Sequence, residues 1–198
     1  LGGGGMGLID FNSDPEINSM KEFSIWNPEK YYNVWLVHKI DGNWAGYATL
    51  APSHGQDNDG SVVLISEFQN ESSVTWAHEM GHGFNLYHTF QGDDDPSSEY
   101  FPCGDDGIFD TPKHIRTMNI PGLYFDCENN DENDCDPNFS VQMSPTHIGD
   151  GTHQDHMRNY MDYTYCGSEF TFGQRDESKL ALINLRSSYL PENGNTAL

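Results

Sequence analysis

One segment of the chain carries residue types at a spacing suited to metal chemistry. Residues 78–88 read HEMGHGFNLYH, with histidines at positions 78, 82 and 88 and a glutamate at position 79. On a helix with about 3.6 residues per turn, His78 and His82 lie one turn apart on one face, so both imidazoles can reach one Zn²⁺. Glu79 is then placed to take a proton from a metal-bound water instead of binding the ion. The segment predicts a hydrolytic zinc centre with His78, His82 and His88 as ligands and Glu79 as general base.

The third histidine requires the helix to stop before it. His88 lies six residues after His82, which on a continuing helix would put it on another face about 9 Å further on. Asn85 stands where the chain must turn. Many helices end in a left-handed residue with positive φ, a conformation that Gly adopts best and Asn next best. We therefore predict a helix break at Asn85.

Segments far from this motif extend the pattern. Residues 159–163 read NYMDY, which is typical of a methionine-centred turn. Further segments are NVW at 33–35, GYA at 46–48, Cys103, DTP at 110–112 and FTFGQ at 170–174. With the zinc motif, this set resembles the pappalysin family of metzincin peptidases, from about Gly7 to Arg186. The resemblance implies that Met161 lies in the turn beneath the zinc and that the Tyr163 phenol lies beside it, where it can hydrogen-bond a developing oxyanion.

The resemblance also implies an α+β fold of the metzincin type. We expect a twisted mixed sheet with the zinc-motif helix above the cleft, then an irregular lower half stabilised by disulfides and calcium, closed by a C-terminal helix. Apolar runs predict strands near 32–40, 44–51 and 61–66, and Ser72 or Ser73 can cap the zinc-motif helix. Apolar positions from Gln174 to Tyr189 predict the closing amphipathic helix, with Leu180, Ile183, Leu185 and Tyr189 on its apolar face.

The length of 198 residues favours one domain. We expect a Gly-rich tail at 1–7, one catalytic domain at 8–190 with subdomains 8–85 and 86–190, and a C-terminal tail at 191–198. The resemblance implies a strand, a long helix and a second strand before residue 32. Thirty-one residues cannot hold all of these, so this part is expected to be absent or supplied by an associated N-terminal fragment.

The charge balance excludes some classes of partner. Thirty-one acidic and nine basic residues give a formal charge of −22, which would repel nucleic acid and anionic lipid. No apolar stretch approaches the roughly 20 residues that cross a bilayer. We therefore expect neither nucleic-acid binding nor a membrane span, and cationic ligands are the natural partners.

Acidic residues gather in clusters at 93–95, 105–106 and 126–136. Close carboxylates are either held by Ca²⁺ or lie in a solvated loop. For the segment 103–112 we favour calcium, because the resemblance implies Asp106 and Asp110 as ligands. For 128–134 we favour a solvated loop.

The four cysteines, at 103, 127, 135 and 166, lack the spacing of a structural zinc site and favour disulfides. Three pairings are possible from the sequence, and the resemblance implies Cys103–Cys135 and Cys127–Cys166. Disulfides indicate an oxidising compartment. We therefore expect a secreted or extracellular protein, with the periplasm as a further possibility.

These observations together predict a secreted zinc metalloendopeptidase. Its peptide or protein substrate would lie extended along the edge strand at 46–50, since an exposed strand edge is a template for another backbone. Two alternatives are a gluzincin-type peptidase, in which a downstream glutamate replaces His88, and a catalytically silent, calcium-stabilised binding module. We interpret the remaining histidines as surface or structural residues: His38, His54, His114, His147, His153 and His156.

Overall fold

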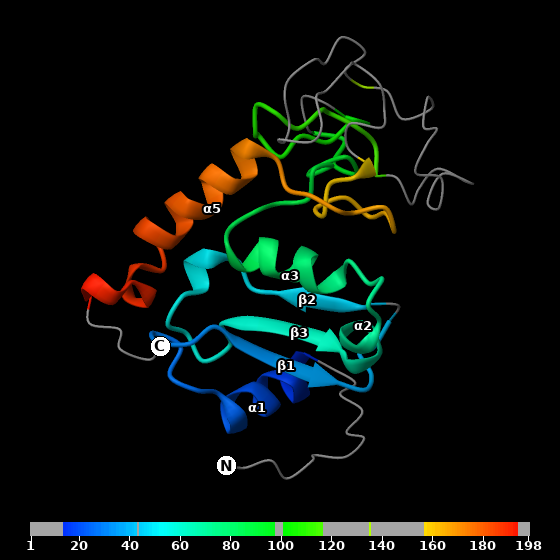
Figure 1. The fold of residues 1–198 in the computed structure, drawn as a ribbon. Helices are drawn as coiled ribbons and strands as arrows, with labels where there is room; N and C mark the ends of the chain where they lie inside the picture. Colours follow the sequence, from blue (N-terminus) through cyan, green and yellow to red (C-terminus); the bar gives the residue numbers. More distant parts are fainter. Residues whose placement is uncertain (1–13, 43, 98–100, 117–134, 136–156, 194–198) are drawn as a thin grey trace. The chain divides into compact units, whose positions relative to one another are not determined.

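The computed structural model describes residues 14–42, 44–97, 101–116, 135 and 157–193 (Figure 1). The chain divides into two compact units. The first comprises residues 1–84 together with 181–198, and the second comprises residues 85–180. The described helices that precede residue 85 and all named strands belong to the first unit.

A three-stranded mixed sheet forms the centre of the first unit (Figure 1). Its strands are β1 (Asn33–Val37), β2 (Gly46–Ala48) and β3 (Gly60–Leu64), in the order β1-β3-β2. β1 runs parallel to β3, whereas β2 runs antiparallel to it. All three lie inside the ranges predicted for strands except the first residue of β3. Among the described strands, β2 forms an edge of the sheet.

Each face of this sheet is covered by one helix (Figure 1). On one face, α1 (Asp14–Ser24) packs Ile17 and Met20 against Trp35, Val37 and Val62. On the other face, α3 (Thr75–Gly83) contacts β2 and β3. Strand residues alternate between faces, so Val62 belongs to the α1 core while its neighbour Val63 faces the other way. The helix that carries the metal motif therefore rests on a sheet that is packed from behind.

Helix α1 was not predicted from the sequence, which indicated no helix before residue 32. Its buried face has two strongly apolar residues, Ile17 and Met20, and is completed by Lys21, which is 1% exposed. The Lys21 ammonium lies 5.0 Å from the ring centre of Trp35 and 5.2 Å from that of Tyr47. It also donates a hydrogen bond of 2.9 Å to the Asn58 carbonyl. A search for apolar periodicity does not count a lysine as a buried position, so it does not predict this helix.

The short helix α2 (Ile65–Gln69) begins where the third strand was predicted to continue. The closing helix is present as α5 (Phe172–Asn184), followed by two 3-10 turns, Ser187–Tyr189 and Pro191–Asn193. Its predicted apolar face is wrong, because Leu180, Ile183 and Leu185 are exposed. The buried positions are instead Gln174, Ala181 and Arg186. Two of these three side chains are polar and are buried because each has hydrogen-bond partners far away in the sequence.

Within the second unit, the described segments are linked by crosslinks and hydrogen bonds more than by regular structure. Cys103 and Cys135 form a disulfide with a Cα separation of 6.1 Å. Cys166 is also disulfide-bonded, whereas the other half of the implied Cys127–Cys166 bridge lies outside the described residues, as does the acidic segment 128–134. Isolated bridges pair Gly104 with His114 and Asn159 with Glu169. Covalent and polar links therefore provide restraint where regular elements are scarce.

Candidate metal centre

Local signals at both ends define the length of α3. At its start the N-cap residue is Val74, which makes no side-chain cap hydrogen bond, so neither predicted serine occupies the cap position. Ser73 lies one residue earlier, where its hydroxyl accepts the backbone N–H of Thr75 at 3.2 Å and donates to Glu67 at 2.7 Å. At its end, Asn85 has a φ of 72°, the only positive value at a described residue other than glycine. This left-handed residue stops the helix and redirects the chain toward His88. The helix thus ends at the predicted turn.

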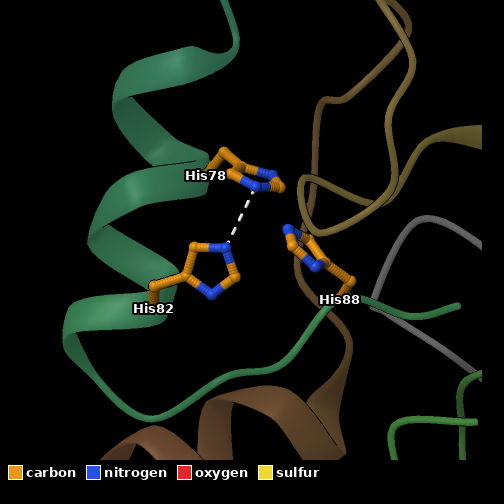
Figure 2. A group of neighbouring side chains, drawn as sticks. All are labelled: His78, His82 and His88. Atoms are coloured by element: carbon orange, nitrogen blue, oxygen red, sulfur yellow. Dashed lines mark hydrogen bonds between the residues drawn. The ribbon is translucent and has the colours of Figure 1, made fainter. Parts of the chain in front are cut away.

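The structure brings the three predicted metal ligands together (Figure 2). His78 and His82 project from consecutive turns of α3, and His88 points toward them from the following segment. One nitrogen from each ring lies within 4.8 Å of the others, and the Nε2 atoms of His78 and His82 are 3.1 Å apart. Nitrogens bound tetrahedrally at about 2.1 Å from one zinc ion lie roughly 3.4 Å apart. The donor set therefore fits a zinc ion, and it is the only such group in the described part of the chain.

Glu79 lies buried on α3 between the two helical histidines in sequence. Its side chain is 4% exposed, and burial raises the pKa of its carboxyl group to about 8. Its Oε2 atom has no hydrogen-bond partner among the described residues. A buried carboxyl oxygen without a hydrogen-bond partner lowers the stability of the fold, and in native proteins such an atom often has a functional role. Glu79 directly follows His78 on α3, and a carboxyl group with a raised pKa is suited to proton transfer.

The predicted methionine turn contacts the segment that follows His88. Met161 is fully buried, and its carbonyl accepts the backbone N–H of Thr89 at 3.2 Å. The Tyr163 ring lies edge-on to the His88 imidazole, with centres 4.8 Å apart. The Phe90 ring stacks on the same imidazole, with its centre 4.8 Å from that of His88 and an interplanar angle of 6°, and lies 4.9 Å from the centre of the Tyr163 ring. The third predicted ligand is therefore held among aromatic rings.

A reciprocal pair of amides supports this turn. Asn159 and Gln174 lie in the NYMDY and FTFGQ segments of the sequence, but no pattern within either segment predicts that the two side chains pair. Asn159 donates to Gln174 at 2.9 Å, and Gln174 donates back to Asn159 at 3.1 Å. The Asn159 oxygen also accepts the Met161 N–H at 2.8 Å, and the Gln174 oxygen accepts the Thr171 N–H at 3.0 Å. Both side chains are buried. The pair fixes the methionine turn to the first turn of α5.

The two predicted calcium ligands have different surroundings. Both oxygens of Asp110 accept hydrogen bonds at the start of α5, from the Thr171 hydroxyl at 2.7 Å and the Gly173 N–H at 2.8 Å. Asp106 accepts the Ile108 N–H at 3.0 Å and a hydrogen bond from Thr111, but its buried Oδ2 atom has no hydrogen-bond partner among the residues that the structure describes. Burial raises the pKa of Asp106 to about 7. Asp110 therefore caps a helix, whereas Asp106 has an oxygen available for a cation.

Comparison with known proteins agrees with this geometry. Residues 16–182 match the M43 peptidases, the family described as pregnancy-associated plasma protein-A. The chain belongs to this family, the pappalysins. An extracellular metalloprotease of Podospora anserina is 30% identical over 159 residues, which is 74% of this chain and 45% of that protein. One from Neurospora crassa is 33% identical over 160 residues, 74% of this chain and 46% of that protein. The chain thus spans about half the length of these relatives.

Solved structures show the same fold. Mature mirolysin of Tannerella forsythia, in complex with a cleaved peptide, aligns with a TM-score of 0.60 at 24% identity over 93% of this chain and 67% of that one. Promirolysin of the same organism aligns with a TM-score of 0.57 at 24% identity, over 90% of this chain and 57% of that one. The expected metzincin-like α+β fold is thereby confirmed. Among the helices that the structure describes, none has the length and apolar character to span a membrane.

Proposed function

We propose that the protein is a secreted zinc-dependent metalloendopeptidase. The observation that carries this proposal is the convergence of His78, His82 and His88, with the buried Glu79 directly after His78 in the chain. Membership of a peptidase family supports hydrolysis, and the all-imidazole donor set favours zinc over calcium or magnesium, which prefer oxygen ligands. The disulfide and the relatives named as extracellular support secretion.

The three imidazoles would hold the ion, each through one ring nitrogen. When bound, zinc would supply Lewis-acid chemistry that lowers the pKa of a water and polarises the scissile carbonyl. Glu79 would accept the proton of the attacking water through Oε2, the oxygen that has no hydrogen-bond partner in the described part of the chain. It would then return the proton to the leaving amine, so that one carboxyl serves first as base and then as acid.

Tyr163 and Met161 would support this chemistry from one turn of the chain. The contact between the Tyr163 ring and His88 supports a role for the phenol as a hydrogen-bond donor to the oxyanion that forms during attack. The buried Met161 would fix the floor of the site through its backbone bond to Thr89, the residue after the third ligand.

The substrate would bind extended along the edge strand, at residues 46–50. Two observations support this placement. β2 pairs with β3 on one side only among the described strands, so its other edge can pair with a peptide. Gly46 in this strand lies against Glu79. A peptide paired with β2 would therefore pass close to the proposed general base, as internal cleavage requires.

Calcium would bind at Asp106, where a buried oxygen without a partner supports a cation. Asp110 would contribute mainly by fixing the start of α5, because both of its oxygens already accept hydrogen bonds. The calcium would thus stabilise the segment around residues 105–111 and would take no part in the chemistry.

A direct test compares the wild-type protein with Glu79→Gln and His82→Ala on a protein substrate. The wild type should cleave it, lose activity to a zinc chelator and regain it with added Zn²⁺. Glu79→Gln should keep about one zinc per chain but lose at least about 10²-fold in kcat, since general base catalysis contributes about 10² to 10⁴. His82→Ala should lose zinc as well. A silent binding module would cleave nothing in any of these forms, and near-normal turnover by Glu79→Gln would exclude the assigned base.

A further inference from the structure

A buried arginine holds the end of the metal-motif helix. Arg186 is fully buried, and its Nε atom donates a hydrogen bond of 2.7 Å to the carbonyl of Gly83, the last residue of α3. Its two terminal nitrogens donate to the two oxygens of Asp59, at 2.6 and 2.8 Å. Asp59 immediately precedes β3. One guanidinium group therefore joins the last turn of α3 to the sheet.

This contact meets a specific need of the helix. The last four carbonyls of a helix have no partner within it, and a cation near that end interacts favourably with the helix dipole. The planar guanidinium can bind a carboxylate with two parallel bonds and still direct Nε elsewhere, which a lysine cannot do. Arg186 therefore fixes both the position and the direction of the end of α3.

Tyr32 closes the same end of the helix from another side. A Cβ atom on Gly83 would overlap the Tyr32 hydroxyl, so this position accepts only glycine without rearrangement. The hydroxyl is bonded to the Ser61 side chain in β3 at 2.7 Å, and the Arg186 guanidinium lies 5.2 Å from the centre of the Tyr32 ring. Gly83 is thus enclosed by groups that are themselves attached to the sheet.

The same cluster contains a serine, a histidine and an aspartate, but hydrogen-bond directions exclude a nucleophile. Ser188 donates its only hydroxyl proton to the Glu29 carbonyl at 2.6 Å. It must therefore accept the proton of His54 Nε2, 2.7 Å away. His54 Nδ1 faces an N–H of Arg186 at 3.3 Å and an oxygen of Asp59 at 3.4 Å. A base for Ser188 would need the opposite polarity. His54 and Asp59 in this cluster both contact the Arg186 guanidinium and hold it in place.

We propose that Arg186 is a positioning residue for the metal centre, an inference that rests on the zinc role proposed above. Gly83 directly follows the ligand His82 and lies two residues before the helix break at Asn85. A shift of the Gly83 carbonyl would therefore change the direction of His82 and the path of the chain toward His88. Groups that orient metal ligands typically contribute 10- to 100-fold to metal affinity or activity.

The test combines Arg186→Met with Asp59→Leu, which removes both charges and avoids leaving a lone carboxylate buried. Ser188→Ala is the matched control, because it disturbs the same cluster but leaves the contact with Gly83. Zinc affinity would be measured by competition with a chelating dye, ligand geometry by the visible spectrum of the Co²⁺-substituted protein, and folding by the melting temperature. The double variant should bind zinc roughly 10- to 100-fold more weakly with a changed cobalt spectrum. Ser188→Ala should match the wild type in both.

A folded double variant with wild-type zinc affinity and an unchanged cobalt spectrum would overturn the inference, even if its melting temperature falls. Arg186→Lys provides a second variant in case the double variant does not fold. It keeps a charge opposite Asp59 but cannot also reach Gly83, and it should show the same weakening of zinc binding. Wild-type protein that binds no zinc would instead refute the proposed function, so the two failures are distinguishable.

Discussion

Gly46 in the edge strand lies directly against Glu79. A Cβ atom at residue 46 would come to 3.0 Å from both Cγ and Oε1 of the glutamate, and equally close to the Val62 carbonyl. Such a contact is tighter than carbon normally tolerates, so one of the groups must move by a few tenths of an ångström. The absence of a side chain at position 46 thus determines where the proposed general base can lie.

Gly46→Ala should therefore displace the Glu79 carboxyl without disturbing the imidazoles. We expect kcat to fall by about 10-fold, because small misplacements of a catalytic group reduce rates steeply, while the zinc content stays at the wild-type level. Steady-state kinetics and metal analysis of the same preparation check this. Unchanged kcat would show that Glu79 has room to adjust and that the glycine has another role.

Asn85→Ala should destabilise the protein through its backbone. The left-handed conformation costs alanine about 1 kcal/mol or more, whereas glycine and, to a lesser degree, asparagine adopt it at lower cost. We expect the free energy of unfolding to fall by about 1 kcal/mol in Asn85→Ala and to stay within about 0.5 kcal/mol in Asn85→Gly. Denaturant unfolding measures both. Equal losses in the two variants would mean that the Asn85 side chain, which reaches Glu177 at 3.4 Å, matters more than its φ.

Lys21 should make the stability of the protein depend on pH in the alkaline range. Burial lowers its pKa from 10.5 to about 8, and the nearby charge of Asp59 opposes this shift. Between these two values the unfolded chain binds the proton and the folded protein does not, so folding becomes more favourable as the pH rises. Below pH 8 the folded protein carries the full cost of the buried charge.

Lys21→Met removes this dependence. Relative to that variant, the wild type should gain up to about 3 kcal/mol in free energy of unfolding between pH 7.5 and 10.5. Parallel urea titrations across this range measure the difference. A constant difference between the two proteins would show that the aromatic rings and the Asn58 carbonyl keep the ammonium charged.

Calcium should raise the melting temperature if Asp106 holds the ion. A ligand that binds only the folded protein stabilises it by about 2.7 kcal/mol at a concentration 100-fold above its Kd. Asp106→Asn should abolish the effect, whereas Asp105→Asn, on the neighbouring carboxylate that pairs with Lys113, should leave most of it. Melting curves with and without a chelator that spares zinc would decide. Wild-type curves that do not change with calcium would indicate that these carboxylates are only solvated.

Cleavage should occur with a broad or apolar preference for the residue after the scissile bond. The segment 163–166 offers no carboxylate to an arginine or lysine side chain, and the guanidinium of Arg116 lies 5.9 Å from the ring centre of Tyr163. The negative charge of the whole chain can speed the approach of basic peptides but does not select the bond. Profiling on a peptide library tests this. A strong preference for arginine or lysine would point to Glu169, the next candidate to mutate.

Local patterns predicted the parts of the site that lie close together in the sequence. His78, His82 and the break at Asn85 follow from helix periodicity and backbone preference, so they needed no knowledge of the tertiary fold. The strands were likewise visible as apolar runs. The side chain of Asp110 shows the limit of such reasoning, because its hydrogen-bond partners Thr171 and Gly173 lie more than sixty positions away and no local pattern predicts them.

Buried polar residues account for most of what the sequence did not reveal. Lys21 completes the core face of α1. Arg186 lies beyond the end of α5 and is buried because it pairs with Asp59, which is 127 positions away in the sequence. Neither has a local signal, since burial of a charge depends on which distant group meets it. Leu180 and Ile183 on α5 are exposed although their spacing predicts an apolar buried face. The buried positions are taken by Gln174 and Arg186, whose side chains have hydrogen-bond partners in the interior.

The paired amides of Asn159 and Gln174 make the methionine turn vulnerable to chemical ageing. Every oxygen of the pair accepts two hydrogen bonds, and one N–H of each crosses to the other. Deamidation of either residue would replace a donor with a second acceptor and bring a charge into a buried place. The turn would then lose its attachment to α5 although no residue near the metal ligands had been altered. In stored protein, activity should therefore fall as mass spectrometry detects a gain of about one dalton in a peptide that contains Asn159 or Gln174 but none of the three histidine ligands.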